Sequence, residues 1–347
     1  MTPATPATPP GPSATPAQVA TVRFGRSDAL VPRVSLGTWA YGGESLNANG
    51  AEVGWSGHDE KLAKASLVRA FELGITHWDT ADVYGDGRSE ALIGELIGAG
   101  TVPRDRLFLA TKVGYSRGRF PHAYHPDLVR ERIDGSLRHL RTDVIDVYYL
   151  HHCDFGPDDA WLEPALDVIR AAQQAGKLRF IGLSDWRDEA IMRVIDRVRP
   201  DVVQPYRNVT HDSFYSSGLA AWCKRHDAGV AFFSPIRHGL LLGKYAAPTT
   251  FPNGDFRNSD KAFADAHILH RLSQNAAALH KRFADRSPEP VLAALIATCL
   301  ADCDTGTVLL GQRHPGQVEA AAHAASLSLS DEELAWVRSL YAGIPSD

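Results

Sequence analysis

Three segments of the sequence, DTADVYGDGRSE, LATKVG and DVYYLHHCD, each follow or end an apolar run rich in Val, Ile, Leu and aromatic residues. They carry four residues able to do chemistry together: Asp79, Tyr84, Lys112 and His151. A parallel barrel builds one polar site by placing such groups at the ends of separate strands. The pattern therefore predicts an enzyme.

An acid, a phenol, an amine and an imidazole could together protonate a carbonyl oxygen while a hydride arrives at its carbon. Tyr84 could be the acid, but a free phenol has a pKa of about 10 and needs a nearby cation and hydrogen-bonding partners to work near neutral pH. Lys112 could supply that cation, Asp79 could hold the ammonium in place, and His151 could orient the oxygen as a hydrogen-bond donor. A lysine within LFLATKVG points inward only if a carboxylate meets it.

Eight strands are needed to place these residues. After TVRFG, which begins a small β-hairpin, PRVSLGTWAYGG is expected to form the first barrel strand. The other seven runs lack polar alternation, as expected when both faces of a sheet are covered; they are ITHWDTA, RLFLATKVG, VIDVYYLHH, RFIGLSDW, DVVQPYRN, GVAFFSPI and TGTVLLG. Amphipathic helical spacing separates them, so the sequence predicts an α/β fold, a (β/α)8 TIM barrel with an N-terminal hairpin.

Helix ends and one long gap refine this expectation. Gly176 and Gly229 stand where a helix needs a left-handed C-terminal cap before the next strand. About seventy residues separate VAFFSPI from TVLLG, which leaves room for a long binding loop and an extra helix. A last helix is expected to begin at Ser330, with Glu333 completing a capping box.

Composition limits the function classes. The chain has 347 residues and a net charge of −5, without a basic stripe, so neither nucleic acid nor a membrane is an expected partner. Four irregularly spaced cysteines predict reduced thiols and a cytoplasmic location. We expect a disordered Thr/Pro/Ala-rich tail over residues 1–20, which is no signal peptide, and one barrel domain over residues 21–347. Oligomeric state stays open.

These segments resemble the aldo-keto reductase superfamily from about Thr21 to Tyr341, and DTADVYGDGRSEALIG is close to that family's first signature. The resemblance implies that Asp79, Tyr84, Lys112 and His151 are the catalytic residues of an NAD(P)H-dependent reductase acting on an aldehyde or ketone, or running the reverse oxidation. No GxGxxG motif marks a Rossmann route to the nicotinamide.

The resemblance also implies a cofactor site. Ser184, Asp185 and Gln204 match residues that hold the nicotinamide carboxamide, and Phe233 matches the ring that stacks on it. The residues that match the loop around the pyrophosphate are Ser234, Ile236, Gly239, Leu241 and Lys244. Those that match the adenosine site are Gly311, Gln312, Arg313 and Gln317.

Two departures from the family pattern affect the cofactor. Asp185 stands where the family usually has Asn, and its charge would favour the cationic oxidised nicotinamide. Ala320 and Ala321 replace the usual Glu-Asn pair near the adenine. Arg313 can pair with a 2′-phosphate, so NADPH is the expected cofactor, with NADH as the alternative.

Trp39 and Trp186, close to strand ends, are the expected substrate-binding residues for a carbonyl compound with an apolar or ring portion. Two other functions are alternatives to this one. A nicotinamide-binding regulatory module of the potassium-channel β-subunit type would keep the cofactor but show little turnover. A metal-dependent hydrolase fails on spacing because no HxH ends a strand and no HExxH lies on a helix, so no metal ligand is predicted.

Overall fold

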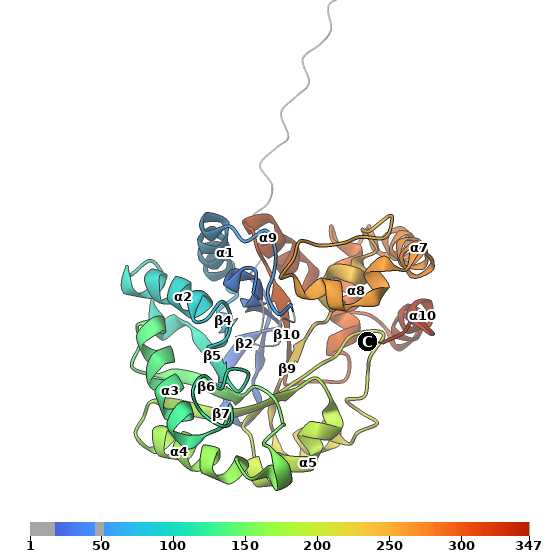
Figure 1. The fold of residues 1–347 in the computed structure, drawn as a ribbon. Helices are drawn as coiled ribbons and strands as arrows, with labels where there is room; N and C mark the ends of the chain where they lie inside the picture. The colour runs from blue at the N-terminus through green and yellow to red at the C-terminus, as the bar shows by residue number, and fades with distance from the viewer. Residues whose placement is uncertain (1–17, 46–51, 347) are drawn as a thin grey trace, which may run out of the picture.

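The computed structural model describes residues 18–45 and 52–346, which form a closed barrel of eight parallel strands ringed by helices (Figure 1). Around the barrel the order is β10, β3, β4, β5, β6, β7, β8 and β9. Their bounds are β3 Val34–Gly37, β4 His77–Asp79, β5 Phe108–Val113, β6 Ile145–Leu150, β7 Leu178–Asp185, β8 Val202–Pro205, β9 Gly229–Phe233 and β10 Gly306–Gly311. The prediction of a (β/α)8 barrel from eight apolar runs is confirmed. The predicted tail lies mostly outside the described residues.

Helices follow the strands in the expected alternation. They are α1 Glu60–Glu72, α2 Arg88–Gly98, α3 Pro126–Leu140, α4 Leu162–Gln174, α5 Asp188–Val198, α6 Leu219–His226, α7 Ala266–Phe283, α8 Pro290–Leu300, α9 Pro315–Ala324 and α10 Asp331–Tyr341. The gap after β9 holds both α7 and α8, and α7, α8 and α10 pack together at one side of the barrel (Figure 1). The capping box of Ser330 and Glu333 is present at α10. None of the helices in the described part of the chain has the length and apolar character that a bilayer crossing requires.

The N-terminal hairpin plugs one end of the barrel. Strand β1 (Thr21–Arg23) pairs antiparallel with β2 (Leu30–Pro32), and the fully buried Phe24 packs among side chains of the barrel interior. Its ring meets Phe108 edge-on at 5.7 Å and lies 5.4 Å from the ring of His77, each the first residue of its strand. The hairpin therefore closes the N-terminal end and leaves the carboxyl ends of the strands for a site.

One predicted helix cap is confirmed and the other is wrong. Gly176 follows α4 with φ +76°, as a left-handed cap requires. After α6 the left-handed residue is Asp227, with φ +50°, while Gly229 begins β9. A Cβ at Gly229 would lie 3.0 Å from the ring of Phe24, so a residue without a side chain is needed here to accommodate Phe24 of the N-terminal hairpin.

His77 should make the fold sensitive to acid. Burial lowers its pKa to about 3, with Lys112 contributing, and its Nδ1 lies 2.9 Å from Ser35 Oγ. The pKa of His77 in the folded state is below its unfolded value of about 6.5, so below about pH 6.5 the unfolded chain binds a proton that the folded protein does not. The folded protein is therefore most stable with respect to this group above about pH 6.5, and it loses that stability as pH falls toward 3. We expect wild type to lose about 2 kcal/mol more than His77→Gln in free energy of unfolding between pH 7 and pH 5. Urea unfolding at both pH values measures this, and parallel pH dependence of the two proteins would contradict it.

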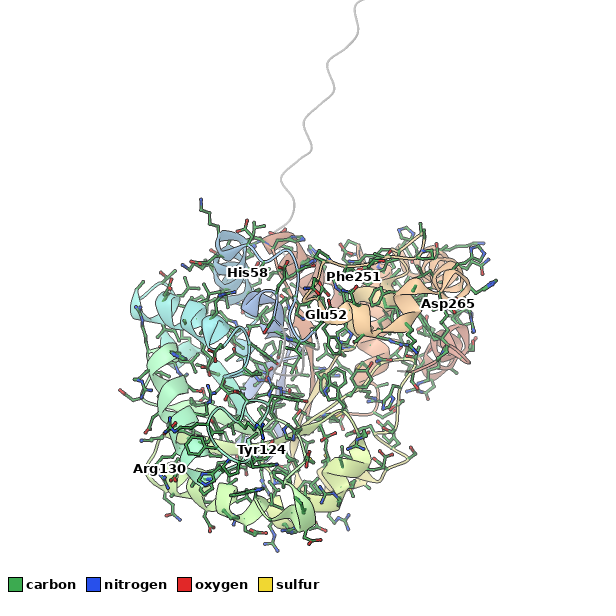
Figure 2. The ribbon with its side chains drawn as sticks, viewed as in Figure 1. Glu52, His58, Tyr124, Arg130, Phe251 and Asp265 are labelled. Carbon is green, nitrogen blue, oxygen red and sulfur yellow. The ribbon has the colours of Figure 1, made fainter. Side chains whose placement is uncertain are left out.

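The long segment after β9 is joined to the loop after β3. Gly54 and Asp255 form an isolated parallel β-bridge. The Asp255 carboxylate also accepts hydrogen bonds from the backbone N–H and the hydroxyl of Ser56, at 2.8 and 2.6 Å. The N–H of Gly254 donates to the Glu52 carboxylate at 2.8 Å; Figure 2 labels Glu52 and Phe251, one residue from each of the two segments. These hydrogen bonds hold together two loops about 200 residues apart in sequence, the loop around Gly54 and the loop around Asp255.

Candidate active site

Asp79, Tyr84 and Lys112 meet at the carboxyl ends of β4 and β5. The fully buried ammonium of Lys112 pairs with the Asp79 carboxylate and also donates to the Thr80 carbonyl oxygen at 2.8 Å and the Tyr84 hydroxyl at 3.3 Å. One ammonium therefore contacts both the carboxylate that holds it and the phenol expected to act as acid.

Strand alternation explains why Lys112 faces the barrel interior. Its neighbour Thr111 points the other way and donates to Glu90 of α2 at 2.6 Å. Asp79, the last residue of β4, accepts a second hydrogen bond from Gln204 Nε2 of β8 at 2.8 Å. The Asp79 carboxylate is thus held from two sides of the barrel.

His151 completes the group of four. Its ring packs edge-on against Tyr84 at 5.8 Å and Tyr115 at 4.6 Å. Burial and the nearby Lys112 hold its pKa well below the ordinary value, so the imidazole is neutral, and its buried Nδ1 has no hydrogen-bond partner among the described residues. His152 is turned elsewhere, with Nε2 2.7 Å from the Gly114 carbonyl oxygen.

Electrostatics keep Tyr84 protonated. Enclosure among protein atoms raises its pKa well above 10, and the carboxylates of Asp79 and Asp82 raise it further. The sequence predicts that Lys112 acts as the cation for this phenol, and its Nζ does lie 3.3 Å from the hydroxyl, but burial keeps the pKa of the phenol raised. Burial also lowers the pKa of Lys112 itself, which Asp79 opposes. The phenol therefore carries a proton that it can donate.

The residues expected at the nicotinamide carboxamide lie side by side on β7 and β8 and bond to the protein. Ser184 donates to the Gln204 carbonyl oxygen at 2.9 Å. Asp185 accepts from the backbone N–H groups of Cys153 at 2.7 Å and Arg187 at 2.9 Å. The Asp185 carboxylate is thus anchored to the loop after β6 and to its own loop.

The residues from the end of β9 onward lie in two places: Phe233 is near Trp186, and Leu241 is in the hydrophobic core beside α7, α8 and α10. Phe233 ends β9 with its ring 5.0 Å from Trp186, and Ser234 and Gly239 both have left-handed backbone, with φ +57° and +88°. Leu241 is fully buried in the cluster of α7, α8 and α10, and Ile236 packs against that cluster. The side chain of Leu241 therefore belongs to the core, and its backbone is also bonded within the protein: its N–H donates to the Ile236 carbonyl oxygen at 3.3 Å and its carbonyl oxygen accepts from the Tyr341 hydroxyl at 3.2 Å.

A cluster of cationic side chains lies between β10 and the two hydrogen-bonded loops around Gly54 and Asp255. Burial lowers the pKa of Lys244, and the positive charges of Arg313 and Arg257 lower it further. Arg313 donates from Nη1 to the Ser56 carbonyl oxygen at 2.8 Å, and Gln317 accepts from the backbone N–H of Arg313 at 2.7 Å. An anion bound here would relieve the mutual repulsion. The sequence analysis missed Arg257, which no periodic pattern marks within its loop.

Gly311 and Gln312 lie where β10 ends. Gln312 is buried, and its carbonyl oxygen accepts from the Tyr41 hydroxyl at 2.6 Å. Its side-chain Oε1 is buried without a hydrogen-bond partner in the ranges the structure describes. Most buried acceptors in folded proteins have a partner, so the end of β10 differs in this respect from the ordinary core.

Aromatic side chains cover the four polar residues. Trp39 stacks on Tyr84 with ring centroids 6.1 Å apart, and Phe256 contacts both Trp39 at 5.0 Å and Trp186 at 5.8 Å. His238 also lies against both tryptophans. The sequence did not mark Phe256, which lies far beyond the end of β9, or His238, which lies within the loop after β9 between the matched residues Ile236 and Gly239.

Comparison with known proteins identifies relatives over most of the chain. The model of the aldo/keto reductase family matches residues 33–342. Aldo-keto reductase YhdN of Bacillus subtilis is 32% identical over 306 residues, which cover 87% of each chain. The NADP(+) aldo-keto reductase yakc of Schizosaccharomyces pombe is 30% identical over 223 residues, 61% of this chain and 63% of that protein. The structure of a glycerol dehydrogenase from Gluconobacter oxydans matches with a TM-score of 0.76 and 28% identity, covering 94% of this chain and 97% of that one.

Proposed function

Since the chain belongs to the aldo/keto reductase family and is an NAD(P)H-dependent oxidoreductase, we propose that it reduces an aldehyde or ketone to the alcohol, or runs the reverse oxidation. The observation that carries this proposal is the Lys112 ammonium, which contacts both the Asp79 carboxylate and the Tyr84 hydroxyl. That arrangement suits proton donation to an oxygen on which negative charge develops.

Tyr84 donates its proton to the carbonyl oxygen of the substrate. Lys112, 3.3 Å from the phenol oxygen, stabilises the phenolate that results, and Asp79 holds the ammonium in place. The neutral His151 imidazole offers a hydrogen bond to the same carbonyl oxygen and orients it. A nicotinamide held at this site would supply the hydride that the carbonyl carbon accepts.

The cofactor in this proposal is NADPH. Its phosphates fit the cations of Lys244 and Arg313, which lie in a partly buried place where their charges repel one another. The loop from Ser234 to Leu241 would surround the pyrophosphate and offer it those backbone N–H groups that are not already bonded within the loop. Ser184, Asp185 and Gln204 would hold the carboxamide, and Phe233 would stack on the nicotinamide ring. Gly311, Gln312 and Arg313 would lie at the adenosine, and Gln317 supports Arg313 by accepting from its backbone N–H.

The substrate enters between Trp39 and Trp186, whose rings favour a carbonyl compound with an apolar or ring portion. The four cysteines, all free and buried, suit the reducing cytoplasm.

Asp185→Asn tests the carboxamide assignment. If the carboxylate lies near the nicotinamide, its removal should strengthen binding of NADPH relative to NADP⁺ by about threefold to tenfold, because the negative charge that favours the cationic ring is lost. Fluorescence titration with each cofactor form gives the ratio of dissociation constants. Asp154→Asn, in the exposed part of the loop after β6, is the control. An unchanged ratio in Asp185→Asn would mean that its carboxylate points away from the ring.

The function itself is tested by following NADPH and NADH absorbance with purified protein and a panel of reactive aldehydes, ketones and quinones. We expect consumption of NADPH with at least one aldehyde or ketone, and slower consumption of NADH. Tight cofactor binding without turnover of any carbonyl or alcohol would overturn the proposal in favour of a regulatory nicotinamide-binding module.

A further inference from the structure

Asp82 is a buried carboxylate to which the mechanism gives no task. It lies between Asp79 and Tyr84 in sequence and is 3% exposed, and neither of its oxygens has a hydrogen-bond partner of good geometry within the described ranges. Nearby on β6, the buried Tyr148 hydroxyl also has no such partner. An ionised carboxylate in such a place is costly unless a cation faces it.

Arg132 of α3 is that cation, and it joins two loops. Its Nε lies 3.5 Å from the Asp82 carboxylate, and its Nη1 lies 4.0 Å from Asp86 at the other end of the Tyr84 loop. Its Nη2 donates to the Ser116 hydroxyl at 3.2 Å. Ser116 follows Tyr115, whose ring packs on His151. One guanidinium therefore links the loop of Tyr84 to the loop that supports His151.

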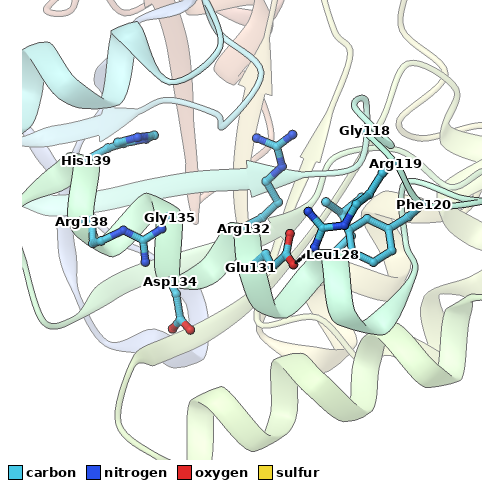
Figure 3. Close-up of a pocket in the computed structure, with 10 residues that line it drawn as sticks. All are labelled: Gly118, Arg119, Phe120, Leu128, Glu131, Arg132, Asp134, Gly135, Arg138 and His139. Carbon is cyan, nitrogen blue, oxygen red and sulfur yellow. Dashed lines mark hydrogen bonds and ion pairs between the residues drawn. The ribbon is translucent and has the colours of Figure 1, made fainter.

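Arg132 is reached from outside the barrel. It lines a groove of about 550 Å³ between α3 and the segment from Gly118 to Phe120. Figure 3 shows its side chain rising from α3, away from Asp134, while Glu131 pairs with Arg119. Small solutes can therefore approach the guanidinium without passing through the barrel mouth.

Charged groups on every neighbouring element act on Asp82. Burial raises the pKa of Asp82 to about 7. Arg132 of α3 and the backbone N–H of Val83 lower this pKa, because they favour the ionised carboxylate. Glu90 of α2 and Asp86 of the same loop raise it further, because they are negatively charged. Glu90 is itself 3.2 Å from His139 of α3. Asp82 in turn affects Lys112 of β5, Tyr148 of β6 and Tyr84, in each case stabilising the protonated form.

We propose that Asp82 and Arg132 are positioning residues of the reductase, whose ion pair holds the Tyr84 loop against the Tyr115 loop and forms only when Asp82 is ionised. The inference rests on the proposed function. Above neutral pH the pair forms, the Tyr84 hydroxyl is held in place, and the charge of Asp82 adds to the burial that keeps that hydroxyl protonated. Below neutral pH Asp82 takes up a proton, and Arg132 loses its buried partner.

The first test is the pH dependence of kcat and KM for wild type, Asp82→Asn and Asp86→Asn. Asp86 is the matched control because it is on the same loop, faces the same guanidinium and has a side chain that is 93% exposed. We expect a rise in wild-type kcat with an inflection near pH 7, and about a tenfold loss of kcat in Asp82→Asn at pH 8, without the inflection and with KM nearly unchanged. Asp86→Asn should follow wild type. An inflection retained in Asp82→Asn would overturn the proposal.

Arg132→Ala offers a second test, because the removed guanidinium leaves a space that opens onto the groove. Guanidinium ion at millimolar concentration, far below denaturing levels, should restore part of kcat in Arg132→Ala and none in Asp82→Asn. Arg132→Lys should retain part of the activity, since it keeps the charge but loses the forked geometry. Equal effects of guanidinium on all variants would contradict the assignment.

A readout without turnover separates this inference from the proposed function. In cofactor-free protein labelled with ¹³C at the tyrosine Cζ, the Tyr84 signal, assigned with Tyr84→Phe, should shift with a midpoint near pH 7 in wild type and stay constant in Asp82→Asn. This result can be obtained even if no carbonyl compound is reduced. A Tyr84 signal that does not change near pH 7 in wild type would overturn the coupling.

Discussion

Tyr84→Phe is expected to lower kcat by a factor of about 10² to 10⁴ while the dissociation constant of the cofactor changes by less than about twofold. The hydroxyl is the atom that Lys112 contacts at 3.3 Å, and its removal deletes the proton that the carbonyl oxygen needs in the transition state. The ring, which stacks on Trp39, is retained, so the packing over the site should persist.

Steady-state kinetics and fluorescence titration measure the two effects separately. Tyr115→Phe is the matched control: this tyrosine also packs edge-on against His151, is 48% exposed, and its hydroxyl accepts a hydrogen bond from Trp186 Nε1 at 3.2 Å. It should keep most of the wild-type kcat. Equal losses of cofactor affinity and rate in Tyr84→Phe would defeat the assignment of Tyr84 as the acid.

Lys112→Met is expected to abolish turnover and to lower the free energy of unfolding by about 3 to 5 kcal/mol. The substitution leaves the Asp79 carboxylate, 3% exposed, without its cation inside the barrel. The double variant Asp79→Asn/Lys112→Met should regain most of the stability but none of the activity, because it removes the buried charge and also the ammonium that serves Tyr84. Urea unfolding of the three proteins tests this.

A surface pair provides the comparison. Lys64 pairs with Glu60 and Glu95 at 2.7 and 2.6 Å, but the ammonium and both carboxylates are substantially exposed. Lys64→Met should therefore cost less than about 1 kcal/mol. Similar losses for Lys64→Met and Lys112→Met would mean that water reaches the Lys112–Asp79 pair and that its burial has little energetic effect.

Features that depend on short stretches of sequence could be predicted. The eight apolar runs became the eight strands because continuous apolar sequence bounded by turns is what a strand covered on both faces requires. Asp79 and Lys112 could be placed together because parallel strands bring their carboxyl ends to one rim, and a lysine inside an apolar strand needs a carboxylate partner.

Other features depend on contacts between distant segments. Gly229 looked like a helix cap, but its small size is required by Phe24, about 200 residues earlier in the sequence. Leu241 matched a cofactor loop, yet its side chain lies in the core beside α7. Phe256 reaches Trp39 and Trp186 because Asp255 is bonded to Ser56 across the barrel mouth.

The sequence by itself determined the barrel, the rim on which the site lies and the types of side chain brought there, since strand periodicity and strand ends are local properties of the chain. Only the tertiary structure decided which atoms each side chain meets: Asp185 with the N–H of Cys153, and Arg132 with Asp82 and Ser116. The reason is physical. Such partners are selected by barrel register and by long loops that fold onto one another, and neither leaves a periodic mark in the sequence.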